Sequence, residues 1–438
     1  MVQNRPNSPG SKFKLVNGRV PIYMRKSQHP TRKHYLKYVA ILFLVVVQAC
    51  ELDPDFKEMQ AETPTFFKRF GGTNMDYAFS VTESMDNFFI ITGYSNSPDL
   101  LSGQNTDNLI IWKFDRLGGK VWTLPKTVKA NSYGNSIIED DNGQYVVVGY
   151  ERNTTGVPGL ETPLFVKFNT DGTTVLIKDL NNPIRTFVSY TVLNDIVDVG
   201  AQYAITGYSD LCVPGCPHML LSYLNTNGSV IEQTWSTDSF AGNDARGRSI
   251  AKSPLRVVSM GDQDGNIIVR ENPGINSMGF VDTIFTATGA QRGNDMVGTN
   301  DGNFAIAGST EMGTNGGLDV LFFVMNNNFQ LVGSKVNIGG AVTDYAESII
   351  AYEGDYVIAG SSNSFSGNGN FDVFLARVTK TGTVVWSRTY EAGDGDEYAQ
   401  EIIATSDGGF MIVGYSEFAN NTTDIFLLKT NKTGEVIQ

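Results

Sequence analysis

A short run of β-branched and aromatic residues that ends in glycine recurs seven times along this chain, closing at Gly93, Gly149, Gly207, Gly261, Gly308, Gly360 and Gly414. Such runs favour strands, and a glycine within a strand marks a bend or a close backbone approach. Successive glycines are 47 to 58 residues apart. This period is too long for a helical solenoid and is close to that of a four-stranded propeller blade. The spacing therefore predicts seven blades.

The sixth repeat shows the expected unit most clearly. Residues 346–360 read as two strands joined by a tight turn at 352–355, and residues 372–390 read as two more. A long polar loop, 361–370, separates these hairpins. Because antiparallel strands alternate in direction, the tight turns should gather on one rim of a ring and the long loops on the other. We expect function on the loop-rich face, since variable loops on a rigid scaffold carry most binding sites.

The repeat also carries a recurrent sequence pattern. In the first repeat it consists of Gly71–Ala78 (GGTNMDYA), Gly93–Ser95 (GYS), Asp107–Lys113 (DNLIIWK) and Gly119–Trp122 (GKVW). This pattern resembles the seven-bladed β-propeller repeat of exported bacterial proteins, over roughly residues 65–438. The resemblance implies an all-β ring of four-stranded antiparallel blades. It implies no particular chemistry, because propellers carry many unrelated activities.

The domain boundaries follow from the repeats and the ends. The last repeat lacks an outer strand, and residues 65–70 have the alternation of one. An N-terminal strand that completes the last blade would leave no open edge in the ring. We expect a signal peptide at 1–49, a tether at 50–64 and a propeller at 65–438, with blades at approximately 71–122, 123–180, 181–235, 236–288, 289–336, 337–390 and 391–438 plus 65–70.

The N-terminal segment has the composition of an export signal. Basic residues precede an apolar stretch from Tyr38 to Val47, which is too short to span a bilayer and has the size of a signal-peptide core. It runs into Val47-Gln-Ala-Cys50, which resembles the lipobox of bacterial lipoproteins. The resemblance implies a lipid (palmitate) anchor on Cys50 of an outer-membrane lipoprotein, facing the periplasm or the cell surface. Met24 is an alternative start to Met1.

Removal of residues 1–49 would leave a strongly acidic chain. This segment holds nine of the 33 Lys and Arg residues and none of the 46 Asp and Glu residues. The remainder has 24 basic and 46 acidic side chains, a formal charge of −22. Such a charge repels phosphate backbones, so no nucleic acid partner is expected. The expected partners are the membrane, through the anchor, and a glycan or an envelope protein; the ring itself is expected to be monomeric.

Histidine and cysteine are scarce after residue 49. His218 is the one histidine there, which excludes a histidine-rich zinc site and leaves a Ser-His-Asp triad one residue to use. Cys212 and Cys216 flank a Val-Pro-Gly turn, and in an exported chain they predict a disulfide. A metal or redox site is the alternative, although this is not the redox spacing. We predict no metal, no cofactor and no catalytic residue.

Aspartates recur at equivalent places, and Asp76, Asp344 and Asp396 mark blade entries on the loop-rich face. Repetition favours loop capping over catalysis, which needs two unique carboxylates. A carboxylate ring that binds a cation is the alternative. Residues 261–266 partly match a calcium loop but have Pro273 where the last acid belongs, so a hairpin turn is predicted there.

The fourth repeat departs most from the pattern and is rich in basic residues. These side chains could pair with neighbouring acids, or form an anion-binding patch for acidic sugars, because arginine binds carboxylates through paired donors. The candidate residues are Arg246, Arg248, Lys252 and Arg256. Tyrosines that follow the marker glycines could stack on sugars or pack between blades. They are Tyr94, Tyr150, Tyr208 and Tyr415.

The sequence favours a lipid-anchored propeller that binds a glycan or a protein through its loop-rich face. It disfavours an enzyme, since no catalytic constellation is evident. One alternative is a polysaccharide-active hydrolase or lyase that uses carboxylates or a Tyr/Arg pair. The other alternative is a structural scaffold in an outer-membrane complex.

Overall fold

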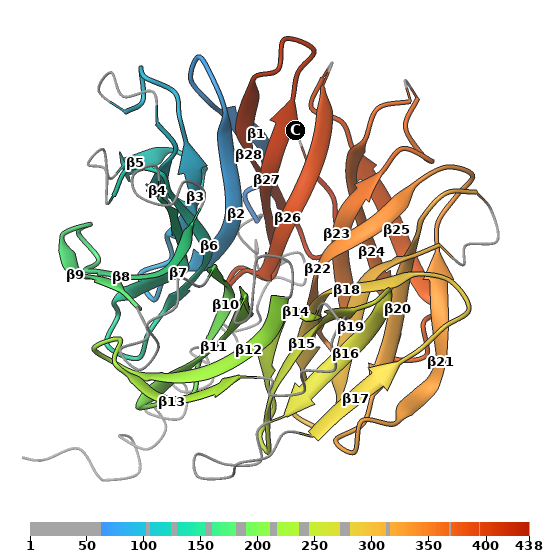
Figure 1. The fold of residues 1–438 in the computed structure, drawn as a ribbon. Helices are drawn as coiled ribbons and strands as arrows, with labels where there is room; N and C mark the ends of the chain where they lie inside the picture. The colour runs from blue at the N-terminus through green and yellow to red at the C-terminus, as the bar shows by residue number, and fades with distance from the viewer. Residues whose placement is uncertain are drawn as a thin grey trace, which may run out of the picture. The chain divides into compact units, whose positions relative to one another are not determined.

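The computed structural model describes residues 63–437 apart from the short segments 102–105, 124–128, 154–159, 181–189, 211–216, 236–244, 272–280, 312–315, 368 and 394. These residues form seven antiparallel sheets of four strands, arranged in a ring (Figure 1). No helix occurs in these described ranges. The expected all-β, seven-bladed propeller is therefore confirmed.

Each of the first six blades is built from four consecutive strands, and the first strand of each lies closest to the centre of the ring (Figure 1). From the centre outwards these strands are β2 (Asp76–Glu83), β3 (Phe89–Ser95), β4 (Asn108–Phe114) and β5 (Lys120–Thr123); β6 (Ser132–Glu139), β7 (Tyr145–Arg152), β8 (Glu161–Phe168) and β9 (Thr174–Asp179); β10 (Thr191–Asp198), β11 (Gln202–Asp210), β12 (Pro217–Asn225) and β13 (Val230–Trp235); β14 (Ala245–Lys252), β15 (Val257–Gln263), β16 (Asn266–Glu271) and β17 (Val281–Phe285); β18 (Gln291–Gly298), β19 (Phe304–Thr310), β20 (Asp319–Met325) and β21 (Leu331–Ile338); β22 (Asp344–Tyr352), β23 (Asp355–Ser362), β24 (Asp372–Val378) and β25 (Val384–Tyr390).

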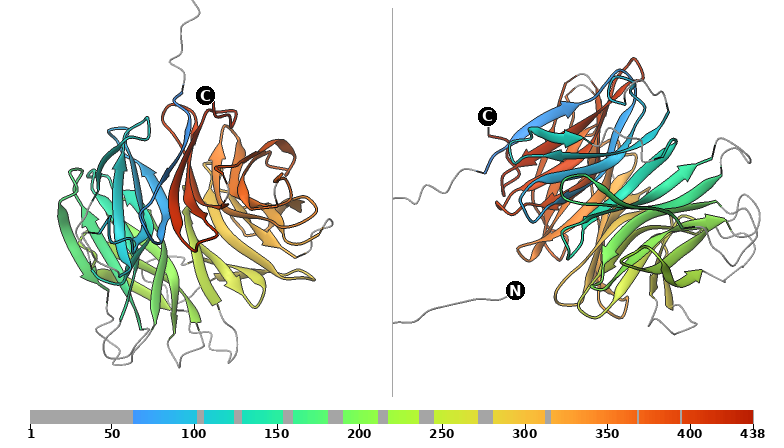
Figure 2. Two further views of the ribbon diagram at one scale, coloured as in Figure 1. Left: turned by 90° about the horizontal axis from the view of Figure 1, so that it is seen from above. Right: turned by 90° about the vertical axis from the view of Figure 1, so that its left-hand side faces the viewer.

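The seventh blade joins the two ends of the ring. It contains β26 (Asp396–Ala404), β27 (Phe410–Glu417), β28 (Thr423–Thr430) and, as its outer strand, β1 (Phe66–Phe70). β1 pairs antiparallel with β28 from Phe66↔Lys429 to Phe70↔Ile425, and Figure 2 shows this strand in blue beside the red C-terminal strands. The N-terminal strand thus covers an edge that would otherwise expose unpaired backbone groups.

The marker glycines mark a close approach between the first two strands of each blade. A Cβ on Gly93 would lie 1.9 Å from the carbonyl oxygen of Tyr77, and the equivalent distance is 1.9–2.0 Å at all seven glycines. No side chain fits there, since real Cβ contacts under 3.0 Å essentially do not occur. Beside each glycine the first strand carries a β-bulge, such as the register shift between Ala78 and Ser80. The glycine period is therefore the period of these bulges.

Pairs between a buried lysine and an aspartate lie at the rim that carries the tight turns. The lysine comes from the end of the third strand and the aspartate from the turn between the first two strands. The Nζ–Oδ distance is 3.0 Å for Lys113–Asp86, 2.7 Å for Lys167–Asp140 and 2.9 Å for Lys429–Asp407. The lysine that ends the third-strand motif is therefore a structural residue.

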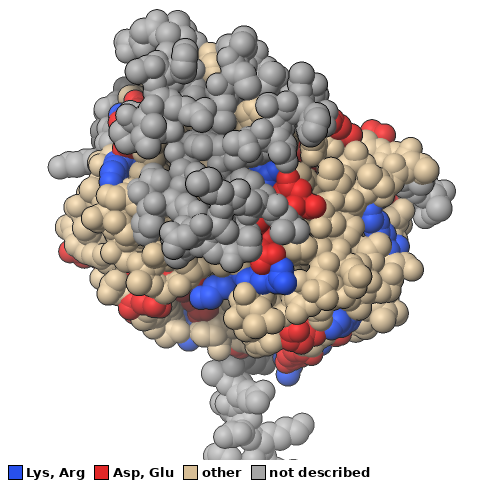
Figure 3. All heavy atoms as spheres, turned by 60° about the horizontal axis from the view of Figure 1, so that its bottom comes forward, with Lys and Arg blue, Asp and Glu red and all other residues tan. Residues whose placement is uncertain are grey.

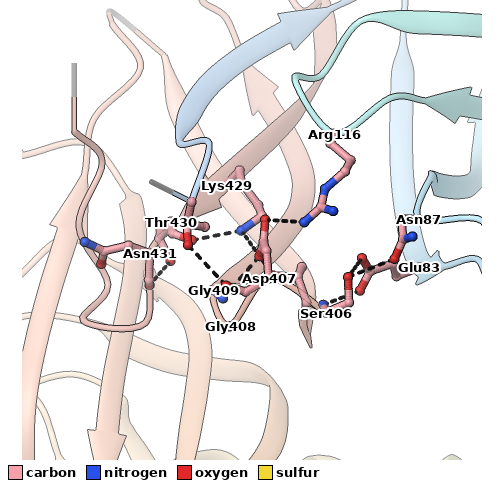
Figure 4. Close-up of polar contacts among 12 residues, drawn as sticks. Glu83, Asn87, Arg116, Ser406, Asp407, Gly408, Gly409, Lys429, Thr430 and Asn431 are labelled. Carbon is pink, nitrogen blue, oxygen red and sulfur yellow. Dashed lines mark hydrogen bonds and ion pairs between the residues drawn. The ribbon is translucent and has the colours of Figure 1, made fainter. Parts of the chain in front are cut away.

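The pair in the last blade also connects the blade to the first one (Figure 4). Lys429 is fully buried, and Arg116, from the β4–β5 turn, approaches the other oxygen of Asp407 at 3.1 Å. Burial alone would raise the pKa of Asp407, but hydrogen bonds from Thr405 and Lys429 lower it to about 2. Ser406 donates from its backbone N–H and from its Oγ to Glu83, both at 2.6 Å. These contacts join the last blade to the first blade on the tight-turn rim.

We predict that Asp407→Ala lowers the free energy of unfolding by about 3–5 kcal/mol, because it leaves the buried Lys429 ammonium without its counter-charge. Arg116→Gln should cost about 1 kcal/mol or less, since Arg116 is 42% exposed. Urea unfolding monitored by fluorescence would compare both variants with the parent. Equal losses in the two variants would contradict the assignment of Asp407 as the partner of a buried charge.

Candidate functional site

The seven bulges line a small cavity in the middle of the ring. Each inner strand contributes its bulged residue and the residue after it. These are Phe79 and Ser80, Asn135 and Ser136, Asn194 and Asp195, Arg248 and Ser249, Asn294 and Asp295, Glu347 and Ser348, and Gln400 and Glu401. The cavity measures about 110 Å³. It is therefore well below the roughly 300–1,000 Å³ of ordinary ligand pockets and can hold only a few water molecules.

Three acids in this ring bridge neighbouring blades. Asp195 accepts hydrogen bonds from Ser136 Oγ and from the backbone N–H of Ile250, each at 2.8 Å. In the same way, Asp295 accepts from the hydroxyls of the serines on both sides, at 2.7 and 2.9 Å. Glu401 accepts from the backbone N–H of Val81 at 2.5 Å. The acids therefore connect inner strands that share no ladder of backbone hydrogen bonds.

Enclosure of these acids changes their protonation. Burial raises the pKa of Glu401 to about 8, and burial together with the nearby charge of Asp295 raises that of Asp195 to about 7. The pKa of Asp295 is also raised by burial. Glu347 has a pKa of about 7, because burial outweighs the attraction of Arg292 and Arg248. The cavity therefore holds protons near neutral pH that the unfolded chain does not.

These raised pKa values predict that stability falls as the pH rises. The folded protein binds more protons than the unfolded chain between about pH 4 and pH 8, so the contribution of these groups is complete below pH 4 and is lost as the pH passes 7 to 8. Each group lowers the free energy of unfolding by at most about 1.4 kcal/mol for each pH unit in this range. Glu401→Gln should therefore flatten the fall in unfolding free energy between pH 5 and pH 9.

Denaturant titrations at stepped pH would measure this slope. Glu353→Gln is the matched control, since its side chain is 58% exposed on the tight-turn rim and should leave the slope unchanged. An unchanged slope in Glu401→Gln would show that this acid is ionised throughout the range.

Two arginines each lie two residues before a bulged, cavity-lining residue, toward the loop-rich end of their strands. Arg246 and Arg292 hold equivalent positions on the adjacent strands β14 and β18, as their pairing with Asp262 and Ser309 shows. Both side chains are exposed, and neither forms an ion pair with any described residue. Arg248, next to the cavity, pairs with Asp262. Positive charge thus gathers on one side of the ring centre at its loop-rich end, which we call the channel mouth.

Aromatic side chains occupy the same level on the other blades. Eight rings follow one another at centroid distances of 4.5–5.9 Å, in the order Tyr150, Tyr133, Tyr94, Tyr77, Tyr415, Tyr398, Phe371 and Tyr345. We call this set the aromatic arc. Several contacts cross between blades, including Tyr94–Tyr133 and Tyr77–Tyr415, and Arg246 lies 5.2 Å from the ring of Tyr208. Packing between blades, one of the two roles expected for the tyrosines, is thus observed.

Burial favours the protonated form of most tyrosine hydroxyls in the arc. Burial raises the pKa of Tyr150 and Tyr398 to about 12 and raises those of Tyr94, Tyr345 and Tyr415 as well. Neutral hydroxyls can donate hydrogen bonds but are poor bases. The arc can therefore bind a ligand more readily than it can catalyse proton removal.

The structure divides the four basic residues expected to form one patch. Arg246 and Arg248 lie in the half of β14 nearer the loop-rich end, whereas Lys252 ends the strand on the opposite rim and donates to Asp198 O at 3.3 Å. Arg256 follows that turn and pairs with Glu271. Arg292 joins the first two instead, but it could be recognised only from the alignment of β14 with β18.

The β15–β16 connection in this blade is the predicted hairpin turn and not a calcium loop. Asp264 and Gly265 have positive φ values of 50° and 75°, and Gln263 pairs with Asn266 across them. This two-residue turn lies on the rim where other blades have long loops. Between β15 and β16 the fourth blade therefore has a short turn instead of a long loop, on the same rim as Arg246 and Arg292.

All three candidate loop-face carboxylates accept hydrogen bonds from loop backbone, and Asp396 does so from Phe371 N at 2.8 Å. Asp76 accepts from Gly72 N and Ser97 Oγ at 2.7 and 2.8 Å, and Asp344 accepts from Gly340 N and Ser364 Oγ at 2.7 Å each. Asp396 is placed differently, because it is Glu397 that pairs with Ser416 as Asp76 pairs with Ser95. The equivalent of Asp76 in the last blade is thus Glu397.

Other candidate residues lie outside the described part of the chain. These residues are Cys50, Cys212 and Cys216, so the structure tests neither the lipidation nor the disulfide. His218 is 8% exposed within β12. Among the described residues, no group of three or more His, Cys, Asp and Glu side chains is arranged to hold a metal ion. The described ranges also contain no apolar helix long enough to cross a membrane.

A larger groove lies at the outer edge of the sixth blade. It has a volume of about 580 Å³ and runs between β25 and residues 434–436. Phe365, which is 50% exposed, and Arg388 contribute to its lining, but Arg388 is occupied by Glu435 at 3.2 Å. On the face shown in Figure 3, basic side chains lie next to acidic ones.

No protein-family model and no curated protein matches the chain. It is similar to the WD40 domain of Neurospora crassa Pan2 at 10% identity and a TM-score of 0.48, over 84% of this chain and 96% of that one. It is also similar to the polysaccharide lyase Uly1 (10%, 0.48, 83% and 91%) and to the α-L-arabinanase of Penicillium chrysogenum complexed with arabinobiose (10%, 0.44, 84% and 100%). At these identities the likeness concerns the fold alone.

Proposed function

We propose that this protein is a non-enzymatic binding module that recognises carboxylate-bearing sugar chains at the loop-rich mouth of its channel. The observation that carries the proposal is the pair Arg246 and Arg292. Both are exposed, both occupy the same position on adjacent blades, and neither has an ion-pair partner among the described residues. By contrast, Arg152, Arg256 and Arg377 each pair with a glutamate or aspartate.

The chemistry of this mouth suits an acidic sugar. A guanidinium group binds a carboxylate through two parallel hydrogen bonds. The aromatic arc adds apolar ring surface and protonated tyrosine hydroxyls, such as those of Tyr150 and Tyr398, that can donate to sugar oxygens. The short Asp264–Gly265 turn places no long β15–β16 loop beside the two arginines. A uronate chain across the mouth would therefore meet charge on one side and rings on the other.

The geometry offers less support for an enzyme. The carboxylates that have raised pKa values line a cavity of about 110 Å³, and Asp195, Asp295 and Glu401 already accept hydrogen bonds from neighbouring blades. A sugar ring cannot enter a space of that size. A polysaccharide hydrolase or lyase remains the alternative function, and it is distinguished by product formation.

The proposal predicts that the protein binds polygalacturonate and does not bind neutral dextran. The double variant Arg246→Gln/Arg292→Gln should weaken binding at least about tenfold, because each charged hydrogen bond is worth roughly 1.5–3 kcal/mol. Titration calorimetry would give the affinity, and the same samples would be assayed for unsaturated products and new reducing ends.

Arg388→Gln is the matched control, since it removes an arginine from the outer groove and should leave binding unchanged. Loss of binding in this variant alone would move the site to the groove. Product release would support the enzyme instead. Failure to bind any acidic or neutral polysaccharide would contradict the glycan proposal and favour an envelope protein partner or a scaffold.

We further propose that Cys50 carries a lipid that anchors the propeller to the outer membrane. The support is the apolar stretch that ends in Val47-Gln-Ala-Cys50. One acylated terminus would tether an otherwise water-soluble ring to the membrane surface.

Expression of the full chain in a diderm bacterium with an alkynyl palmitate label would test the anchor. We expect the protein to be labelled and to sediment with outer membranes, and Cys50→Ser to abolish both. Cys212→Ser should keep the label. A labelled Cys50→Ser variant, or an unlabelled parent, would contradict the anchor.

A further inference from the structure

The fold brings two particular positions together at the junctions between blades on the loop-rich face. One is the inner-strand residue at the level of Asp344 in β22, and the other is the residue of the third strand in the preceding blade at the level of Asp319 in β20. At two acid junctions the inner-strand residue donates its backbone N–H to the carbonyl just before the other position, Asp344 N to Leu318 O at 2.7 Å and Glu397 N to Phe371 O at 2.6 Å. Ser132 N and Gln291 N make the equivalent bonds to Asp107 O and Gly265 O. At the junction that closes the ring, Asp76 N donates to Thr423 Oγ1 at 2.8 Å instead.

The residues at these two positions differ around the ring. Four junctions have no acid there, and by register their pairs are Ser132 with Asn108, Thr191 with Thr162, Ala245 with His218, and Gln291 with Asn266. Three consecutive junctions have an acid at both positions. These three acid pairs are Asp344 with Asp319, Glu397 with Asp372, and Asp76 with Asp424.

At the junction of Asp319 and Asp344, the two acids lie against the same glycine-containing turn, whereas Ala392 holds the equivalent position before Glu397. A Cβ on Gly339 would lie 2.3 Å from Asp319 Oδ1 and 2.7 Å from Asp344 Oδ2, so both carboxylates border one point. At the junction that closes the ring, a Cβ on Gly71 would lie 1.7 Å from Asp424 Oδ1. A side chain at either position would collide with these carboxylates, so the two glycines allow the acids to approach the turn closely.

The acid pairs also contain buried oxygens without partners. Asp76, Asp344 and Glu397 are fully buried. One oxygen of Asp76, one of Asp344 and both of Glu397 accept no hydrogen bond from the described residues. Buried polar atoms are almost always satisfied, so three equivalent exceptions at consecutive junctions indicate a missing partner that is not part of the described chain.

Negative charge accumulates around the acid pairs. Glu391 and Asp396 act electrostatically on Asp372, and Asp372 acts in the same way on Glu397. Arg69 is the basic side chain that acts on both Glu397 and Asp424, but it forms no ion pair with a described carboxylate. The missing partner should therefore be positively charged.

We propose that each acid pair binds one calcium ion, so that three calcium ions link the fifth, sixth, seventh and first blades. The donors are carboxylate oxygens alone, which suit a hard cation. Calcium accepts irregular sets of six to eight oxygens, including main-chain carbonyls and water, whereas magnesium demands a near-octahedral set. Two carboxylates per ion correspond to a weak extracellular-type site, with a dissociation constant of about 10⁻⁴–10⁻³ M. The ions would clamp the ring where its two ends meet.

Equilibrium dialysis of the purified full-length protein against millimolar calcium at pH 7.5 tests the number of sites. We expect three bound ions per chain, and a higher melting temperature in calcium than in chelator or in equal magnesium. The double variant Asp319→Asn/Asp344→Ser reproduces the neutral pair of the first junction and should bind two ions. Glu397→Gln, which keeps the shape of the side chain, should also bind two, and it serves if the double variant fails to fold.

Asp171→Asn is the matched control, because Asp171 is an exposed turn residue away from the pairs and its loss should leave three ions bound. Absence of saturable calcium uptake by the parent would overturn the proposal, as would unchanged uptake in both Glu397→Gln and the double variant. Stabilisation by acid but not by calcium would assign the pairs as carboxyl groups that share a proton. These outcomes do not depend on whether polygalacturonate binds.

Discussion

The contact between a bulged inner strand and the glycine of the second strand is the constraint on which the rest of this structure depends. The bulge turns one extra residue of each inner strand toward the channel, and the glycine lets the backbone come close enough for this to happen. Because all seven blades repeat it, two residues per blade line the central cavity. The acids among them then reach the backbone N–H groups of neighbouring blades, as Asp195 reaches Ile250.

The two rims of the ring treat buried charge in opposite ways. On the tight-turn rim each buried lysine has an aspartate from its own blade, so the charge is compensated locally. On the loop-rich face three consecutive junctions bring two acids together, and five of these six acids are buried. The first arrangement stabilises without any ligand. The second leaves like charges in contact, which is costly unless a proton or a cation lies between them.

Local signals made much of the fold predictable. Strand patterns and turn residues predicted seven blades, the strand order within them, the closing N-terminal strand and the hairpin turn at Asp264–Gly265. The candidate site was less accessible, because it combines residues from different blades. Neither Arg292 nor Glu347 was identified, and Asp396 was chosen where Glu397 holds the equivalent position. Four basic residues were predicted to form one patch, although Lys252 and Arg256 lie at the opposite end of β14 from Arg246 and Arg248. A shift of one residue in register accounts for the choice of Asp396 over Glu397.

The sequence by itself determined how many blades form and how the ring closes, because glycine spacing and apolar alternation are local properties that repeat along the chain. Only the tertiary structure decided which side chains face the channel and which acids meet at the junctions. Those outcomes depend on bulge register and on contacts between residues about one blade apart, such as Asp295 and Ser348, which are separated by 53 positions. Such contacts leave no mark on the neighbouring residues of either partner, so no local pattern predicts them.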